Sequence, residues 1–177
     1  RTPTQAAEGA DVIGTSGGVA GGATDHMPRL VAELGRLSLW KVAVKPGKPL
    51  AVGRIGAAQY FGLPGNPVSA AVTLLVFVLP ALRRLAGLPD PLPRLWPVRL
   101  RDGIDRRPGR EEYLRGCWVE GSATDGKPWA VALSGQASHQ LTGMAAADCL
   151  LRVAADRGDL TPGSLVEALP LPWSRGL

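Results

Sequence analysis

The first part of the chain has an apolar pattern that predicts strand, helix and strand. A short apolar strand is expected at residues 11–15. Four apolar positions within residues 27–34 follow the i, i+3, i+4, i+7 spacing of one helix face. Thr24 or Asp25 is expected to cap this helix. Alternation over residues 37–44 predicts a second strand, and a unit of this length is a right-handed parallel crossover.

The next segment has the pattern of two short strands and a long helix. Strands are expected at residues 50–55 and 60–63, and if they form a hairpin, the later one runs in the direction of the first two strands. A helix is expected from residue 67 to about residue 85, with Asn66 at its cap. Pro80 should disturb this helix near its end, because proline removes an interior hydrogen bond.

The pattern changes at residues 85–95, which hold three prolines in 11 residues and are typical of a linker. Every later segment resembles a strand, and Asp125 with Gly126 gives a hairpin turn signal. Such a series of short strands predicts a small β-barrel or sandwich. The five strands are expected at residues 96–101, 112–119, 129–133, 149–153 and 165–169. The predicted organisation is an α/β domain at 1–88, a Pro-rich linker at 89–95, an all-β domain at 96–172 and a tail at 173–177.

The predicted sheet of the first domain is small for a stable domain. Three parallel strands with two helices leave an apolar sheet face and an edge uncovered. We therefore expect preceding strands to be absent, so that the chain corresponds to the C-terminal part of something longer.

Charge is more informative than composition, which is ordinary at 45% hydrophobic and 20% charged residues. The net charge is +5 and the isoelectric point is near 9.8, which fits nucleic acid, a membrane surface or an anionic small molecule as partner. Lys41, Lys45 and Lys48 fall within eight residues, whereas no basic stripe alternates with aromatic residues. This favours an anionic small molecule and no nucleic acid.

Cysteines and the longest apolar run exclude two further classes of site. Cys117 and Cys149 lie far apart, with no other His or Cys at metal-ligand spacing, which argues against zinc and fits a reduced, cytoplasmic setting. The apolar segment 67–82 has 16 residues, and a membrane span needs about 20. It is therefore interpreted as a buried helix, with no membrane partner.

Three loops are expected at the carboxyl edge of the predicted sheet, where open α/β sheets bind ligands. Their sequences are TSGGVAGGATD, KPGKP and LPGNP. Glycines in the first let backbone amides approach an anion, and a helix N-terminus follows. The second supplies ammonium groups, and the third directs the free amides of the long helix. Prolines 64 and 67 fix the third loop before binding, which matters because ordering costs about 1–2 kcal/mol per residue.

Each of these features also has a purely structural interpretation. Glycine loops are often simple turns, lysine clusters are often solvated, LPGNP suits helix capping, and Asp25 suits an N-cap. What favours a binding site is the convergence of all three loops on one edge beside a carboxylate. The loops match neither a P-loop nor a dinucleotide fold, and no serine lies in a hydrolase elbow.

The loop motifs together resemble the molybdopterin molybdenumtransferase family, which is related to the E domain of gephyrin. The resemblance rests on TSGG-V-x-x-G-x-x-D, WKVAVKPGKPLAVG and FGLPGNPVSA, and downstream on REEYLRG and GQASHQLTGMAAADCLL. It covers roughly residues 8–172. The resemblance implies part of a molybdopterin-binding α/β domain with a mostly parallel sheet flanked by helices, followed by a small β-barrel.

The resemblance also implies a reaction and a set of site residues. Molybdate is transferred to the dithiolene of adenylylated molybdopterin, with Mg²⁺, and AMP is released. Asp25 matches the acidic residue that handles metal or molybdate, and Lys41 and Lys45 match pocket lysines. The implied substrate-binding residues are Thr15, Ser16, Gly17, Gly18, Lys48, Pro64, Gly65, Asn66, Pro67, Ser69 and Ser138. His139 contacts ligand or is a surface residue.

Further expectations follow from the family. Its members are dimers whose active site draws on the partner's N-terminal region, so these 177 residues alone are expected to be inactive. Contacts with the adenylyltransferase and with molybdoenzyme acceptors are also implied. Two other functions stay open, namely a molybdopterin adenylyltransferase, which lacks the barrel, and a gephyrin-like module that binds a partner's peptide.

Overall fold

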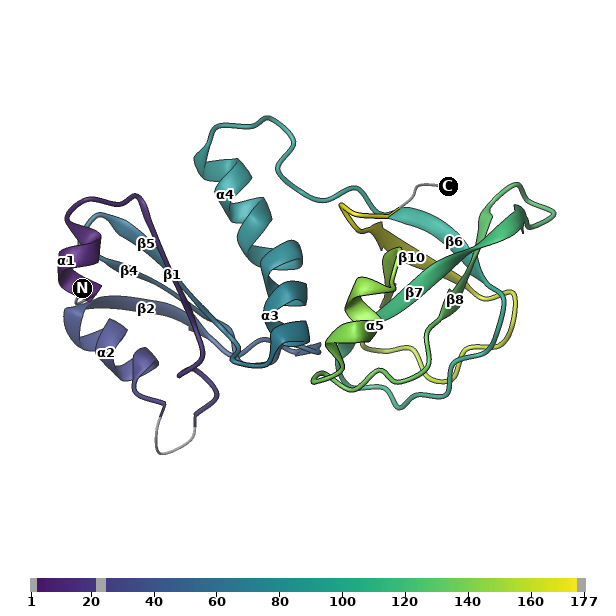
Figure 1. The fold of residues 1–177 in the computed structure, drawn as a ribbon, viewed down its shortest axis with the longest axis horizontal. Helices are drawn as coiled ribbons and strands as arrows, with labels where there is room; N and C mark the ends of the chain where they lie inside the picture. The colour runs from purple at the N-terminus through teal and green to yellow at the C-terminus, as the bar shows by residue number, and fades with distance from the viewer. Residues whose placement is uncertain (1–2, 22–24, 175–177) are drawn as a thin grey trace. The chain divides into compact units, whose positions relative to one another are not determined.

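The structure is a computed structural model that describes residues 3–21 and 25–174. The chain divides into two compact units (Figure 1). The first consists of Arg1–Val42 and Pro46–Pro91, and the second of Ala43–Lys45 and Leu92–Leu177.

The first unit is built on a four-stranded mixed sheet in the order β1-β5-β4-β2. Its strands are β1 (Val12–Ser16), β2 (Gly35–Trp40), β4 (Ala51–Ile55) and β5 (Ala58–Leu63). β1 and β5 are parallel, while β4 is antiparallel to both β5 and β2. The expected hairpin of β4 and β5 is therefore confirmed, and β1, β2 and β5 run in one direction.

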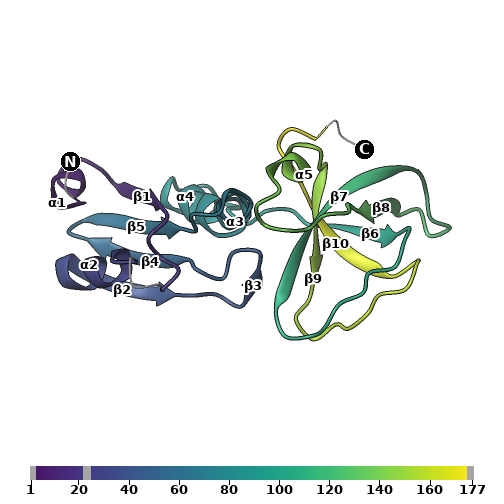
Figure 2. The same ribbon diagram turned by 60° about the horizontal axis from the view of Figure 1, so that its bottom comes forward.

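Two short helices and one long helix lie against this sheet (Figures 1 and 2). α1 (Pro3–Ala7) and α2 (Met27–Leu34) contact β4 and cover a core that includes Ile13, Val31, Ile55 and Tyr60. The predicted limits of α2 are confirmed. Its N-cap is His26, with no side-chain capping bond, so the prediction of Asp25 as cap is wrong. The alternative cap, Thr24, lies outside the described residues.

The second predicted strand, residues 37–44, is wrong at its end. β2 stops at Trp40, and Lys41 has φ of 71°. A left-handed conformation at a non-glycine residue does not continue a strand. The chain returns to β4 through bonds from the Lys41 and Val42 amides to the Leu50 and Lys48 carbonyls, both 2.9 Å. The residues between them include β3 (Val44–Lys45), which belongs to the second unit.

The long helix spans Pro67–Leu85 as predicted, but with an irregular middle. It comprises α3 (Pro67–Thr73), a π-helical turn (Leu74–Val78) and α4 (Leu79–Leu85). The Leu79 amide donates to the Leu74 carbonyl, five residues back. The turn widens immediately before Pro80, whose ring would clash with a carbonyl of a regular helix. The disturbance predicted at Pro80 therefore takes the form of a π-helical turn.

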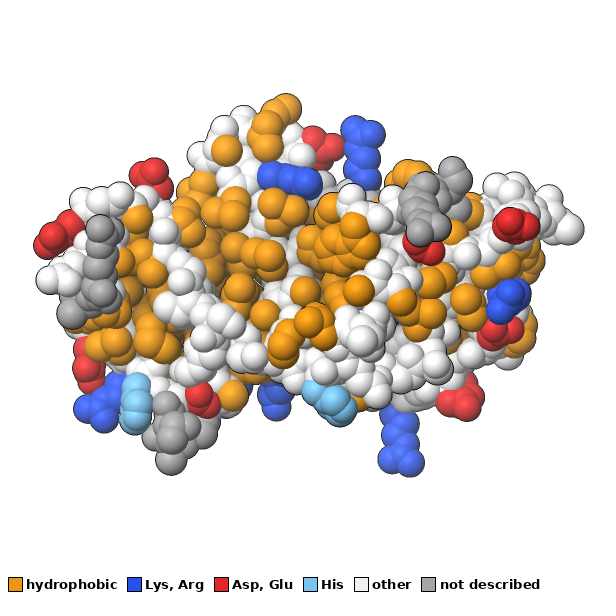
Figure 3. Space-filling model, in the orientation of Figure 1, with side chains coloured by type: hydrophobic (Ala, Val, Ile, Leu, Met, Phe, Trp, Pro, Cys, Tyr) orange, Lys and Arg blue, Asp and Glu red, His pale blue; other side chains and the backbone are white. Residues whose placement is uncertain are grey.

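The long helix is less buried than the sequence suggested. Only 33% of its most apolar 18-residue window is buried, and Leu74 is 42% exposed. Figure 3 shows hydrophobic side chains gathered over this helix. By length and composition it is the one helix of the described residues that could cross a membrane, a test that core helices also pass.

The second unit is a closed five-stranded β-barrel. Its strands are β6 (Trp96–Leu100), β7 (Glu111–Ser122), β8 (Pro128–Ala132), β9 (Cys149–Val153) and β10 (Leu165–Pro170). They pair in the order β7-β8-β6-β10-β9, and β9 pairs with β7 to close the barrel. β3 adds to the start of β7 as a parallel strand. The sequence predicted all five barrel strands.

The barrel interior is apolar, as the alternation of its strands requires. Val98, Leu100, Leu151 and Ala168 are fully buried in one cluster. The predicted turn at Asp125–Gly126 joins β7 and β8, with Gly126 at φ of 76°. A short helix, α5 (Leu141–Ala145), was not predicted.

Candidate functional site

The carboxyl edge of the first sheet brings together the ends of three strands. Thr15 on β1 is in register with Gly62 on β5, Gly62 with Ala51 on β4, and Ala51 with Trp40 on β2. The loops that follow β1, β2 and β5 therefore leave from one level of the sheet. In the first unit, Gly17–Gly21, Lys41 and Pro64–Asn66 lie at this edge. The predicted glycine and proline loops are therefore found there, whereas the predicted lysine loop, KPGKP, begins with Lys45 in β3 of the second unit.

The glycine loop and the proline loop lie directly against each other. The Gly17 amide donates to the Leu63 carbonyl at 2.9 Å, and the Ser16 hydroxyl donates to the Pro64 carbonyl at 3.3 Å. Gly17 and Gly18 have φ of 87° and 73°, which glycine adopts without strain. A Cβ on Gly65 would stand 3.4 Å from the Gly17 Cα. The close approach of the two backbones thus depends on small residues.

The side chains of Thr15 and Ser16 already have partners within the fold. Thr15 Oγ1 and Tyr60 Oη share a hydrogen bond of 2.7 Å. Tyr60 is fully buried, and this burial raises the pKa of its phenol. The pair fixes the end of β1 to β5, so Thr15 supports the edge as well as being a predicted substrate residue.

Lys41 reaches the glycine loop from β2. Its ammonium lies 4.3 Å from the centre of the Trp40 ring, and a Cβ on Gly21 would stand 3.3 Å from its Nζ. The Lys48 carbonyl accepts backbone hydrogen bonds within the loop between β2 and β4, and the Lys48 side chain is exposed. Of the three clustered lysines, Lys41 is the one whose ammonium the structure places beside the glycines.

The N-terminus of the long helix follows the proline loop. Pro67 occupies the first turn and Asn66 the N-cap, as predicted, but Asn66 makes no side-chain capping bond. Its Oδ1 is instead buried without a hydrogen-bond partner. Buried acceptors are normally paired, so this oxygen is able to accept a further hydrogen bond at the loop. Ser69, also predicted, is buried on the first turn of this helix.

Asp25 immediately precedes the N-cap of α2 and is partly exposed. Magnesium is usually bound by one or two carboxylates together with phosphate oxygens of a substrate. Among the residues that the structure describes, no group of three or more His, Cys, Asp or Glu could hold a metal. A metal at Asp25 stays a prediction.

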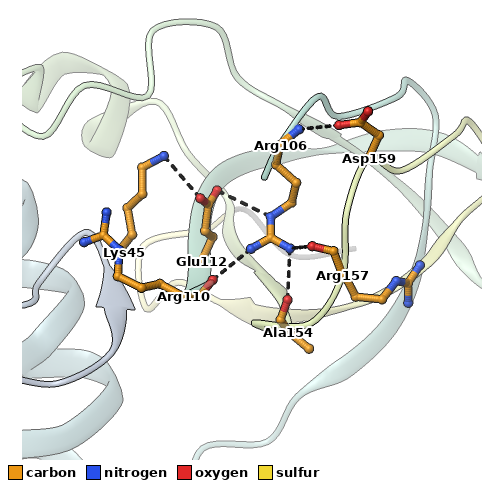
Figure 4. Close-up of polar contacts among 7 residues, drawn as sticks. All are labelled: Lys45, Arg106, Arg110, Glu112, Ala154, Arg157 and Asp159. Atoms are coloured by element: carbon orange, nitrogen blue, oxygen red, sulfur yellow. Dashed lines mark hydrogen bonds and ion pairs between the residues drawn. The ribbon is translucent and has the colours of Figure 1, made fainter. Parts of the chain in front are cut away.

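Lys45 lies in β3, which belongs to the second unit, where it contacts Glu112 (Figure 4). Its Nζ donates to Glu112 Oε1 at 3.1 Å, and the other oxygen of this carboxylate is 3.9 Å from Arg106 Nε. Lys45 and Glu112 flank a hollow of about 470 Å³, which Arg107 and Arg110 also line. The sequence had continued the second strand of the first unit to residue 44, but β2 ends at Trp40 and the alternating sequence does not reveal this break.

Arg106 is the anchor of that cluster. Its guanidinium donates to the carbonyls of Ala154 at 3.0 Å, Arg110 at 2.8 Å, and Arg157. Its backbone amide donates to Asp159 at 2.7 Å (Figure 4). The side chain is 2% exposed, so this arginine serves to fasten loops.

Ser138 lies in a loop of the barrel that a second buried arginine holds. Arg115 on β7 donates to the carbonyls of Gln140 at 2.6 Å, Gly135 at 2.7 Å and Ala137 at 3.1 Å. Burial lowers the pKa of this guanidinium. Arg115 could not be singled out from REEYLRG, because only the folded barrel shows that its neighbours there are buried. His139, in the same loop, is exposed.

Comparison with known proteins agrees with this arrangement of two units. A family model described as "Probable molybdopterin binding domain" matches residues 2–84, and "MoeA C-terminal region (domain IV)" matches residues 97–171. The solved structure of a molybdopterin biosynthesis MoeA protein from Pyrococcus horikosii superposes with a TM-score of 0.73 at 27% identity, covering 94% of this chain and 38% of that one. The chain belongs to the MoeA family and corresponds to its C-terminal part.

Curated relatives of this MoeA-family chain carry enzyme names. A molybdopterin molybdenumtransferase from Haemophilus influenzae is 31% identical over 166 residues, which are 91% of this chain and 40% of the relative. Gephyrin from Dictyostelium discoideum is 34% identical over 182 residues, which cover 90% of this chain and 25% of gephyrin. The chain thus spans less than half the length of these relatives.

Proposed function

We propose that this chain takes part in molybdenum insertion during molybdenum cofactor biosynthesis. The substrates would be molybdate and adenylylated molybdopterin, and AMP would be released. The observation that carries the proposal is the sheet edge on which Gly17, Lys41 and the N-terminus at Asn66 lie together, because every substrate of this reaction is an anion. The names of the molybdenumtransferase relatives support the same activity.

The bonds that form and break in this reaction define what the residues must do. Two Mo–S bonds form as oxygen leaves molybdate as water with the thiol protons, and water cleaves the phosphoanhydride bond to AMP. The chain's part is to bind and orient the anions. Lys41 and the amides of the glycine loop supply positive charge that would stabilise the leaving phosphate. The buried Asn66 Oδ1 would accept a hydrogen bond from a bound substrate.

Lys45 remains a predicted catalytic residue, as do Asp25 and Lys41, and Ser138 remains a predicted substrate-binding residue, on the strength of the family resemblance. We also propose that the natural protein is a homodimer and that these 177 residues do not turn over alone. Contacts with an adenylyltransferase and with molybdoenzyme acceptors belong to the same proposal.

The test is AMP release from adenylylated molybdopterin in the presence of molybdate, measured for the natural full chain and for the 177 residues alone. We expect release by the full chain only. No release by the full chain would end the proposal. ATP-dependent adenylylation of molybdopterin would instead indicate an adenylyltransferase, and peptide binding without release a gephyrin-like module.

A further inference from the structure

Trp40 joins two parts of the sheet edge that are distant in sequence. It is the last residue of β2, and its indole Nε1 donates to the Val19 carbonyl at 2.9 Å. Val19 is fully buried and lies in the middle of the glycine loop. The bond therefore ties the end of one strand to the loop that follows another.

The same indole ring also supports the Lys41 ammonium. The distance from Nζ to the ring centre is 4.3 Å, within the range of a cation–π interaction. Lys41 adopts φ of 71°, a conformation that a non-glycine residue takes only when its surroundings impose it. Strain of this kind concentrates at functional sites and switch regions.

Gly21 shows how closely these groups are fitted together. A Cβ there would stand 3.3 Å from the Trp40 Cζ2 and 3.3 Å from the Lys41 Nζ. Both distances are tighter than ordinary van der Waals contact. The glycine loop, the indole and the ammonium thus form one packed group.

We propose that Trp40 is a positioning residue that holds the glycine loop and the Lys41 ammonium in one arrangement for the phosphate of a bound nucleotide. The inference rests on the proposed function, in which AMP is the leaving group. Trp40 contributes little as a core residue, because 41% of its surface is exposed. Its polar and cation–π contacts instead fall on the two groups that face the anion.

The experiment measures AMP binding by the full chain across a range of ionic strength, with Trp40→Leu, Trp40→Phe and Leu39→Ala as variants. Leu39 is the matched control, because it is 42% exposed on the same strand. We expect Trp40→Leu to weaken binding about tenfold, since it loses one hydrogen bond and one cation–π contact. Trp40→Phe keeps a ring beneath the ammonium and should recover part of that loss.

The salt dependence separates positioning from general stabilisation. Trp40→Leu should flatten the salt dependence of AMP binding, as Lys41→Ala does. The affinity of the double variant for AMP should lie within about threefold of that of Lys41→Ala. Fully additive losses, or a Trp40→Leu effect equal to that of Leu39→Ala, would overturn the inference. Absence of AMP binding by the unaltered chain would instead count against the proposed function.

Discussion

The two units hold their loops by different means. In the first, glycines and backbone bonds fix the loops of the sheet edge, as at Gly17 and Leu63, and the charged ends of Lys41 and Lys48 stay exposed. In the second, two buried guanidinium groups, Arg106 and Arg115, fasten the loops by donating to carbonyls.

This difference determines what a charged side chain does in each unit. A buried arginine that donates to several backbone carbonyls is committed to stability, because removing it leaves buried acceptors unpaired. An exposed lysine beside a glycine loop contributes little to folding and can bind a ligand. Substitution of charged residues should therefore affect turnover in the first unit and stability in the second.

The largest effect is expected at Asp25. Asp25→Ala should abolish turnover in the AMP-release assay of the full chain, while changing the free energy of unfolding by about 1 kcal/mol or less. The structure favours a small folding effect because His26, and not Asp25, is the N-cap of α2. Asp11→Ala is the control and should keep activity, because Asp11 is exposed and lies just before β1 in the first unit. Normal turnover by Asp25→Ala would remove Asp25 from the reaction.

Arg115→Met tests the second unit. The variant leaves the carbonyls of Gly135, Ala137 and Gln140 without their donor. We expect a loss of about 3–5 kcal/mol in the free energy of unfolding, measured by urea denaturation. Arg29→Met, at an exposed helix arginine, should leave it nearly unchanged. Equal effects of the two variants would contradict the contrast between the units.

The same contrast explains which features could be predicted from the sequence. The barrel strands and α2 follow from alternation and helical spacing, which reflect burial on one face. The sheet-edge loops follow from glycine and proline, whose backbone limits are local. The exit of β3 to the barrel could not be predicted, because Val44 and Lys45 continue the alternation of β2 and only the conformation of Lys41 ends it.

Some features of the candidate site could likewise not be predicted from the sequence pattern. A capping residue such as Asn66 predicts a capping bond, yet its oxygen is buried and unpaired. Arg106 and Arg115 look like ordinary surface residues until the barrel closes around them. Their roles depend largely on carbonyls that are distant in sequence, such as Ala154 for Arg106 and Gln140 for Arg115, which local sequence does not encode.

Gly62→Ala tests the close fit of the first unit. A Cβ at Gly62 would stand 2.7 Å from both Tyr60 Oη and Val19 Cγ1. Such overpacking costs about 1–3 kcal/mol, and it should also weaken AMP binding by displacing Val19 in the glycine loop. Gly14→Ala on β1 is the matched control, since nothing lies within 4 Å of its added methyl group. Thermal unfolding of both variants would show whether fit, and not loss of glycine as such, matters.

Lys45→Ala should have a smaller effect, on both stability and AMP binding. Because Lys45 pairs with Glu112 and is half exposed, its loss should lower stability by less than about 1 kcal/mol. If it also faces substrate, AMP binding weakens severalfold at low salt and less at high salt. Calorimetric titration of AMP at two salt concentrations measures this, with Lys127→Ala as the control. Unchanged affinity at low salt would leave Lys45 as a structural residue only.

The smallest effect is a pH dependence of the barrel that involves Glu111. A hydrogen bond from Arg152 at 2.7 Å, aided by one from Tyr113 at 2.6 Å, lowers the pKa of this carboxyl in the folded state. The unfolded state therefore binds more protons as pH falls, so the contribution is present above the ordinary carboxylate pKa and is lost on acidification through the folded-state pKa. Glu111→Gln should be less stable than the unaltered chain at pH 7, and the gap should narrow below about pH 4.5. Urea denaturation from pH 7 to pH 3 measures the gap, and a gap that stays constant over this range would show that Glu111 acts through packing and not through its charge.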